Sequence, residues 1–256
     1  MKMDLKTRNI LKRRADKYEC FSFTENDPSQ FMHLVKGREN KEATAFVASS
    51  LSFGSRLQFL PKIQFILDEA QGNMARWIRE GKFESVFSRD DKRCFYRFFS
   101  YSSMNKFFSA YKSAIDEYGS LGKLVADKAE GDAYKAIKAI CAHFKAHGSS
   151  GIIPVDASSS CKRICMFLRW MVRDKSPVDI GLWASFIDRK TLIIPLDTHV
   201  LHEAASLGLA KITSPTMCAA KKLTAILAEA FPDDPTRGDF ALFGFGAESA
   251  DASKRT

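Results

Sequence analysis

A run of serines leads into a helical pattern that carries a row of basic side chains. Serine, the residue at positions 158–160, is a common helix N-cap. One stripe of the helix that follows, at offsets of four, seven and eleven residues, contains Lys162, Met166, Arg169 and Arg173. The first backbone N–H groups of a helix can bind an anion. The segment therefore predicts a basic helix face with a phosphate-binding site at its start.

A second segment brings an aspartate to the start of another helix. Asp197 follows the apolar residues 192–196 and precedes a helical pattern. The ordinary interpretation is an N-cap aspartate, which stabilises a helix by about 1 kcal/mol. The apolar approach also fits a carboxylate that is partly shielded from water and accepts a proton from a nearby amine. Taken alone, the segment favours the cap.

Taken together, the two segments resemble the helix-hairpin-helix DNA glycosylase superfamily. In its endonuclease III-type members the catalytic lysine opens a helix after a glycine-rich hairpin, and an aspartate follows in V-D-T-H, here Leu196-Asp197-Thr198-His199. Archaeal oxoguanine glycosylases continue the lysine helix as K-x-x-x-x-F-L-R, matched by Lys162 and Phe167-Leu168-Arg169. Residues 179–183 and 239–246 are similar to further parts of these enzymes, so the resemblance covers about residues 150–246. The whole chain is still more similar to a bacterial family described only as a conserved domain of unknown function.

The resemblance implies a lysine-dependent glycosylase that needs no metal or other cofactor. Lys162 would attack C1′ of the sugar, and Asp197 would accept the lysine proton or stabilise the developing positive charge. We expect the amine and the carboxylate to lie within about one water molecule of hydrogen-bond distance.

The implied partner is double-stranded DNA with a damaged base turned out of the stack. The residues that would contact this DNA are Ser158, Ser159, Ser160, Arg163, Arg169, Arg173, Phe53, Arg56 and His199. Phe53, in the turn at residues 48–56, would fill the gap left by the base. Trp183 would stack on the base, although a buried tryptophan in a core is the more common arrangement.

Two departures from the superfamily pattern keep other functions open. Ser158 and Ser160 stand where the hairpin glycines are expected, and the stretch between Lys162 and Asp197 is longer than in endonuclease III, with residues 175–190 as the extra segment. Glycine lets backbone amides approach a phosphate closely. The alternatives are a non-catalytic DNA or RNA binder that retains the fold, and a nucleic-acid enzyme with another reaction such as RNA processing.

Charge favours a nucleic-acid partner. The net charge is +9, and residues 1–16 contain six basic and two acidic side chains. No apolar run approaches the roughly 18 residues that span a bilayer, and charges interrupt the N-terminal stretch where a signal peptide needs an apolar core. We expect a cytoplasmic, nucleoid-associated monomer.

Cysteine and histidine predict no metal centre. The six cysteines include no C-x-x-C pair and no run that would hold an iron–sulfur cluster, so we expect reduced thiols. His143 and His147 are one helical turn apart, but the sequence shows no third ligand beside them.

Helical periodicity dominates and predicts an all-α, two-lobed fold of the helix-hairpin-helix glycosylase type. We expect helices at 4–17, 42–69 (two helices broken at 52–55), 73–80, 90–101, 104–117, 120–128, 132–147, 160–173, 198–207, 215–230 and 236–246. Most of the 21 phenylalanines should lie in the core. Within one unit of residues 1–256, residues 41–147 would form the middle lobe, 1–40 with 148–246 the hairpin-containing lobe, and 247–256 a tail.

Overall fold

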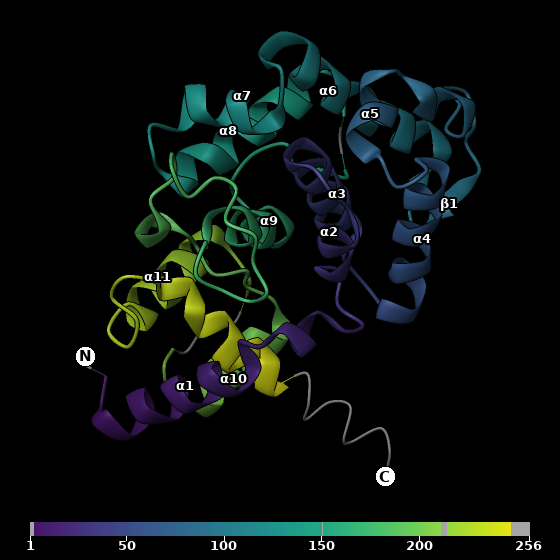
Figure 1. The fold of residues 1–256 in the computed structure, drawn as a ribbon. Helices are drawn as coiled ribbons and strands as arrows, with labels where there is room; N and C mark the ends of the chain where they lie inside the picture. Colours follow the sequence, from purple (N-terminus) through teal and green to yellow (C-terminus); the bar gives the residue numbers. More distant parts are fainter. Residues whose placement is uncertain (1–2, 150, 211–213, 247–256) are drawn as a thin grey trace. The chain divides into compact units, whose positions relative to one another are not determined.

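The computed structural model describes residues 3–149, 151–210 and 214–246, and these are mostly helical (Figure 1). The α-helices are α1 (Leu5–Tyr18), α2 (Gln30–Leu34), α3 (Arg38–Leu51), α4 (Arg56–Glu69), α5 (Met74–Arg79), α6 (Tyr101–Tyr118), α7 (Leu121–Ala129), α8 (Ala133–Ala146), α9 (Lys162–Val172), α10 (Thr198–Ser206) and α11 (Met217–Leu227). Shorter helical turns are η1 (Phe21–Thr24), η2 (Lys82–Ser85), η3 (Arg189–Thr191), η4 (Pro235–Arg237) and the π-helix η5 (Phe240–Gly244). Within the described ranges, no helix has both the length and the apolar character needed to cross a bilayer.

Most of the predicted helices are confirmed, with ends that differ by a few residues. The break within 42–69 lies between α3 and α4, as expected. Helix α2 and the short turns have too few residues to show a helical period in the sequence. The predicted tail at 247–256 lies outside the described residues.

The predicted helix at 90–101 is wrong, because a small hairpin occupies most of it. Strand β1 (Cys94–Tyr96) pairs antiparallel with β2 (Phe99–Ser100). Arg97 turns the chain with a φ of 54°, in the left-handed region that a helix interior does not allow. Ser100 then caps α6 by accepting the N–H of Ser103 at 3.1 Å, which fixes the helix start at Tyr101.

The chain divides into two compact units, which we call the terminal unit and the middle unit. The terminal unit contains Met1–Phe23, Asp132–Tyr134 and Ser158–Thr256, and the middle unit contains Thr24–Gly131 and Lys135–Ala157. The main borders therefore lie after Phe23 and Ala157, whereas the sequence suggested borders near residues 40 and 147.

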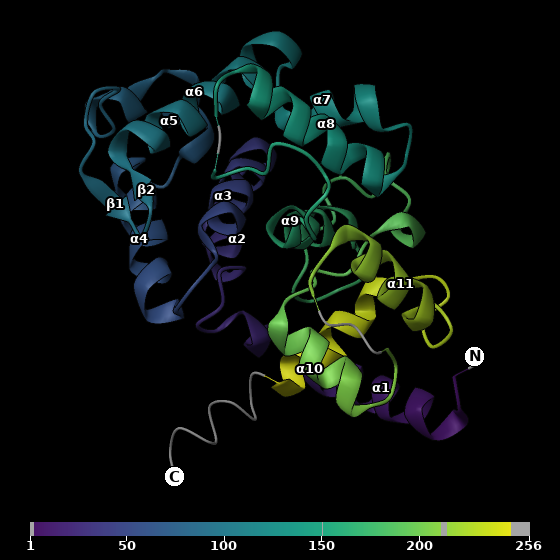
Figure 2. The ribbon, with the colours of Figure 1, turned by 180° about the vertical axis from the view of Figure 1, so that it is seen from behind.

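The terminal unit packs the first helix against the last described helical segment. Figure 2 shows α1, α10 and the yellow segment that contains η5 side by side, and both helices contact η5. A Cβ at Gly244 would lie 2.6 Å from Cγ of Tyr18, so the close approach of α1 and η5 requires glycine there. Helix α11 contacts η4, which precedes η5.

The middle unit has an aromatic core. The Phe46 ring of α3 lies 5.3 Å from Tyr111 of α6 and 5.2 Å from Phe144 of α8, measured between ring centroids. A neighbouring cluster joins Trp77 of α5 to Phe108 of α6 in an edge-to-face contact at 5.1 Å. These rings are buried, which confirms the expectation that the phenylalanine-rich segments supply core residues.

Candidate active site

Lys162 is the first residue of α9 and is held there by an unusual turn. The preceding residue, Cys161, is buried and adopts a φ of 46°. An isolated β-bridge joins Ser159 to Thr216, at the start of α11. The cap residue Cys161 provides no side-chain hydrogen bond to the helix start. The turn thus places its left-handed residue at position 161. Cys161, and not one of the serines expected from the sequence, is the N-cap of α9, and its side chain makes no hydrogen bond to the first turn.

Asp197 is delivered by a buried extended segment. Leu192, Ile193, Ile194 and Leu196 are buried, and the N–H of Ile194 donates to the Thr224 hydroxyl of α11 at 3.0 Å. Asp197 has extended backbone angles and begins α10 as its N-cap, with Oδ1 accepting the N–H of Val200 at 2.9 Å. The cap predicted from the sequence is therefore present.

The same carboxylate pairs with the lysine amine. Nζ of Lys162 lies 2.7 Å from Oδ2 of Asp197, a direct contact without an intervening water. The lysine side chain is 32% exposed and the aspartate side chain 14%. The ring of Phe243, in η5, lies 5.9 Å from Nζ. An amine at the surface with a shielded base in contact has the geometry of a nucleophile and its proton acceptor.

Arg169 does not lie on an open basic face, so its predicted contact with a DNA phosphate is wrong. Its side chain is 4% exposed and donates from Nη1 to Asp239. Its Nε lies 3.3 Å from Oδ1 of Asp179. A guanidinium enclosed by carboxylates is stabilised by them and has no free surface for an anion.

The same correction applies to Arg173, whose side chain is 2% exposed. The guanidinium pairs with Asp179 and with Asp234, 2.8 Å away, and Glu19 of the segment after α1 lies 2.5 Å from Nη2. Burial opposes this charge, but the three carboxylates together raise the pKa of Arg173. The α9 stripe is therefore split: Lys162 reaches the surface, and the two arginines hold the terminal unit together.

Asp239 links this buried network to the lysine. The pKa of Asp239 is raised to about 6, because burial and the negative charge of Asp197 together outweigh the opposing effect of Arg169. The charge of Lys162 lowers it, so all three groups lie within electrostatic reach of one another. The sequence assigned no role to Asp239, and nothing in its local pattern distinguishes it from a helix-start aspartate.

The remaining predicted contacts of the terminal unit differ in exposure. Ser158, Ser159 and His199 are exposed, Arg163 is half-buried and Ser160 is buried. Exposed side chains at the starts of α9 and α10 therefore accompany the Lys162–Asp197 contact.

Trp183 is a core residue, and the prediction that it stacks on a flipped base is wrong. It is 1% exposed and packs edge-to-face against Phe167 of α9, with ring centroids 5.0 Å apart. Its second ring neighbour is Phe186, at 5.7 Å. Because the indole ring is enclosed by other side chains, it stabilises the terminal unit and leaves no room for a base.

Phe53 and Arg56 belong to the middle unit, where they have partners of their own. Phe53 is half-exposed and packs against the rings of Tyr96 and Phe99, with centroids 4.9 and 5.0 Å away, and its carbonyl accepts the Tyr96 hydroxyl. Arg56 lies 3.7 Å from Asp27. These contacts neither support nor exclude the DNA contacts expected for Phe53 and Arg56, which stay predictions.

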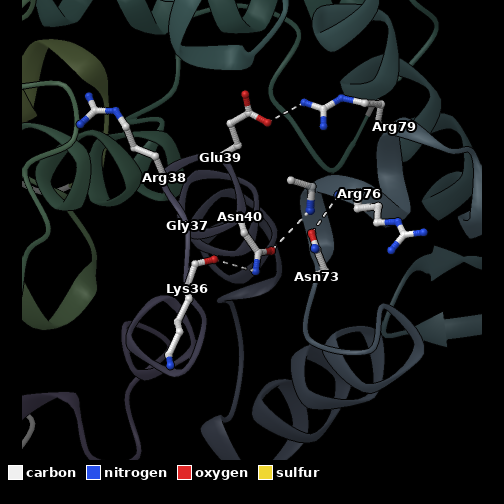
Figure 3. Close-up of a pocket in the computed structure, with 9 residues that line it drawn as sticks. Lys36, Gly37, Arg38, Glu39, Asn40, Asn73, Arg76 and Arg79 are labelled. Carbon is white, nitrogen blue, oxygen red and sulfur yellow. Dashed lines mark hydrogen bonds and ion pairs between the residues drawn. The ribbon is translucent and has the colours of Figure 1, made fainter.

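The middle unit also contains a hollow of about 430 Å³ between the starts of α3 and α5 (Figure 3). Four basic residues, Lys36, Arg38, Arg76 and Arg79, contribute to its lining. Carboxylates already neutralise two of them, because Arg79 pairs with Glu39 at 2.6 Å and Arg76 pairs with Glu80 at 2.8 Å. Among the residues that line the hollow, no lysine amine contacts a shielded carboxylate, so the Lys162–Asp197 contact in the terminal unit is the stronger candidate for chemistry.

Comparison with known proteins assigns no activity to the chain. A family model matches residues 27–248, and the family is described as a protein of unknown function (DUF2400). No curated protein matches the chain, and no solved structure does.

Proposed function

The chain belongs to the DUF2400 family, whose model spans most of its length, and we propose that it is a lysine-dependent DNA base-excision glycosylase. The observation that carries the proposal is the direct contact of 2.7 Å between the Lys162 amine and the Asp197 carboxylate. A lysine amine is protonated at neutral pH and attacks carbon only after a base has taken its proton. Asp197 is that base, in hydrogen-bond contact and largely shielded from water.

The reaction begins when Lys162 transfers a proton to Asp197 and its nitrogen lone pair attacks C1′ of the damaged nucleotide. The bond between C1′ and the base breaks, and its electron pair leaves with the base, which is then protonated. Nζ then loses a proton, and its lone pair forms a double bond to C1′ as the bond between C1′ and O4′ breaks. The electron pair of that bond goes to O4′, which takes up a proton, so the sugar opens and a protonated Schiff base joins C1′ to Nζ. Water hydrolyses this imine, or β-elimination first breaks the strand on the 3′ side.

The surroundings of the pair support a grip on the DNA backbone. The first N–H groups of α9 carry a partial positive charge and receive no hydrogen bond from the cap side chain. Exposed Ser158 and Ser159 precede this helix start, and exposed His199 stands in the first turn of α10. We assign these groups to phosphate contacts that place C1′ beside Nζ.

The division into two helical units is compatible with the two-lobed glycosylase fold, which we propose for the chain together with an oxidised purine as its target. The same surroundings would suit a non-catalytic binder, in which Lys162 and Asp197 form only an ion pair. Catalysis is what distinguishes the two functions.

The test is base release and strand breakage on duplexes that each contain a single lesion. Asp197→Asn keeps an oxygen that can cap α10 but removes the proton acceptor, so it should leave the free energy of unfolding within about 0.5 kcal/mol. It should slow the reaction by on the order of 100-fold or more. Asp197→Ala should lose the rate and, in addition, about 1 kcal/mol of stability.

Lys190→Gln is the matched control, because Lys190 is an exposed lysine of the same unit that pairs with Asp233. It should react as fast as the wild type. A wild-type protein that binds lesion-containing duplexes but releases no base from any of them would establish the non-catalytic alternative.

A further inference from the structure

Three metal-binding side chains meet at the ends of two helices of the middle unit. Glu117 lies in the last turn of α6, His143 lies in the last turn of α8, and His147 follows that helix. Each offers a ligand atom, and these atoms all lie within 4.8 Å of one another. The sequence showed the two histidines without a third ligand; the fold supplies it from a helix 26 residues upstream of His143.

Hydrogen bonds fix which nitrogen of each ring is free. Nε2 of His143 lies 3.0 Å from the carbonyl oxygen of Ala110, and Nδ1 of His147 lies 2.9 Å from the carbonyl oxygen of His143. A carbonyl oxygen only accepts, so these nitrogens carry the protons. In the neutral rings the lone pairs are therefore on Nδ1 of His143 and Nε2 of His147. Metal-binding histidines are commonly oriented in this way by backbone carbonyls.

The free nitrogen of His147 faces a carboxylate. Nε2 of His147 lies 2.9 Å from Oε1 of Glu117. A lone pair and a carboxylate oxygen at this distance repel each other unless a cation, either a proton or a metal ion, compensates. Two tetrahedral ligands at about 2.0–2.1 Å from one zinc ion lie roughly 3.3 Å apart, so the ion is expected to move the Glu117 carboxylate and the His147 ring apart slightly and to draw His143 toward them.

The helix geometry favours the positive charge further. Both α6 and α8 present their C-terminal ends to the cluster, and a helix C-terminus carries a partial negative charge. His143 is buried, whereas the side chains of His147 and Glu117 are 33% and 44% exposed. The cluster is thus anchored on one side and open to water on the other, so a solvent molecule can complete a fourfold coordination.

We propose that Glu117, His143 and His147 bind one Zn²⁺ ion, with water as the fourth ligand. Two imidazoles and one carboxylate suit Zn²⁺ better than the hard cations Mg²⁺ or Ca²⁺, which prefer oxygen ligands. The ion joins the end of α6 to the end of α8 and stabilises the middle unit. This role is independent of the reaction proposed for Lys162.

The test is calorimetric and thermal titration of the full chain with ZnCl₂ after removal of metal by chelation. We expect one Zn²⁺ per chain and a rise in Tm of about 5 °C at a Zn²⁺ concentration on the order of 100 times Kd. Glu117→Gln and His147→Gln change partly exposed side chains, so both variants should fold, and each should weaken Zn²⁺ binding by at least about 10-fold. His143 is avoided as a first variant because its ring is buried.

His202→Gln is the control, because His202 is an exposed histidine of α10 in the terminal unit. It should bind Zn²⁺ with unchanged affinity and show the same rise in Tm. Two results would overturn the proposal: a wild-type chain that takes up no stoichiometric Zn²⁺, and Zn²⁺ binding that is unchanged in both Glu117→Gln and His147→Gln. The second result would assign the ion to other groups, such as the exposed thiols of Cys94 and Cys218.

Discussion

Asp197 uses its two carboxylate oxygens for different tasks. Oδ1 accepts the N–H of Val200 and caps α10, while Oδ2 contacts the Lys162 amine. The cap holds the carboxylate in place, because a rotation that brought Oδ2 away from the lysine would also break the bond to Val200. An aspartate that caps a helix can therefore also hold its second oxygen against an amine, which is the position that the proposed base requires.

The raised pKa of Asp239 predicts a pH dependence of stability that can be measured. Its pKa rises in the folded state from 3.8 to about 6, mainly because the carboxyl is buried. A raised pKa means that the folded state binds the proton more tightly, so the stabilisation is present below pH 4 and is lost as the pH rises through about 6. A shift of about two units corresponds to roughly 3 kcal/mol. The free energy of unfolding of the wild type, relative to that of Asp239→Asn, should therefore fall by about this amount between pH 4 and pH 7.

Urea unfolding of both proteins at several pH values measures this difference. Asp234→Asn is a suitable control, because Asp234 belongs to the same network but is nearer the surface. A difference between wild type and Asp239→Asn that stays constant from pH 4 to pH 7 would contradict the raised pKa.

Helix α9 shows how far the sequence predicts an element and where it stops. Its bounds follow from local apolar periodicity and were predicted to within two residues. The stripe of Lys162, Arg169 and Arg173 was also predicted, but not what lies opposite it. The carboxylates that enclose the two arginines come from residues 19, 179, 234 and 239, and no local pattern announces such distant partners.

The hairpin of β1 and β2 was missed in the sequence for a related reason. Aromatic residues at 95–99 suit a strand as well as a helix, and the choice depends on the left-handed turn at Arg97 and the cap at Ser100. Local signals placed Lys162 and Asp197 each near a helix start. Their contact was expected only from the superfamily resemblance, and their catalytic role stays a prediction.

We predict that Arg173 stabilises the terminal unit and does not contribute to DNA affinity. Arg173→Met leaves Asp179, Asp234 and Glu19 without their shared cation and should lower the free energy of unfolding by about 3–5 kcal/mol. Arg13→Met, on the exposed face of α1, should change it by no more than about 0.5 kcal/mol. Chemical unfolding measures both. A folded Arg173→Met protein of unchanged stability but much weaker DNA binding would restore the interpretation of α9 as a basic DNA-binding face.

Over the whole molecule, the exposed positive charge lies on other elements than the sequence suggested. The net charge is +9, but Arg169 and Arg173 are neutralised inside the terminal unit. Helix α1 keeps exposed basic side chains at Lys6, Lys12, Arg13 and Lys17. The fold places α1 against η5, whose Phe243 lies beside the Lys162 amine, so these charges belong to the same unit as the reactive pair. The sequence favoured both residues 1–16 and the α9 stripe as basic surfaces, whereas the fold buries Arg169 and Arg173 and leaves basic side chains of α1 exposed.

DNA affinity should accordingly depend on salt through α1. Binding of an undamaged duplex should weaken as salt rises, and changing both Lys12 and Arg13 to Gln should reduce the slope of log K against log salt by about one per lost phosphate contact. Fluorescence anisotropy over a range of KCl concentrations measures the slope. Changing Lys82 and Lys92, two exposed lysines of the middle unit, to Gln removes the same charge and serves as the control. Equal slopes for the wild type and the α1 variant would exclude α1 from the interface.

The central claim is that Lys162 forms a covalent bond with the sugar, and borohydride trapping tests it most directly. Borohydride reduces the Schiff base to a stable amine, so incubation with DNA that contains an abasic site or a lesion should give a covalent complex. Peptide mapping by mass spectrometry should find the adduct on Lys162. Lys162→Gln should abolish trapping while it binds DNA nearly as well as the wild type, and Lys190→Gln should trap fully. An adduct on another residue, or trapping that persists in Lys162→Gln, would contradict the account.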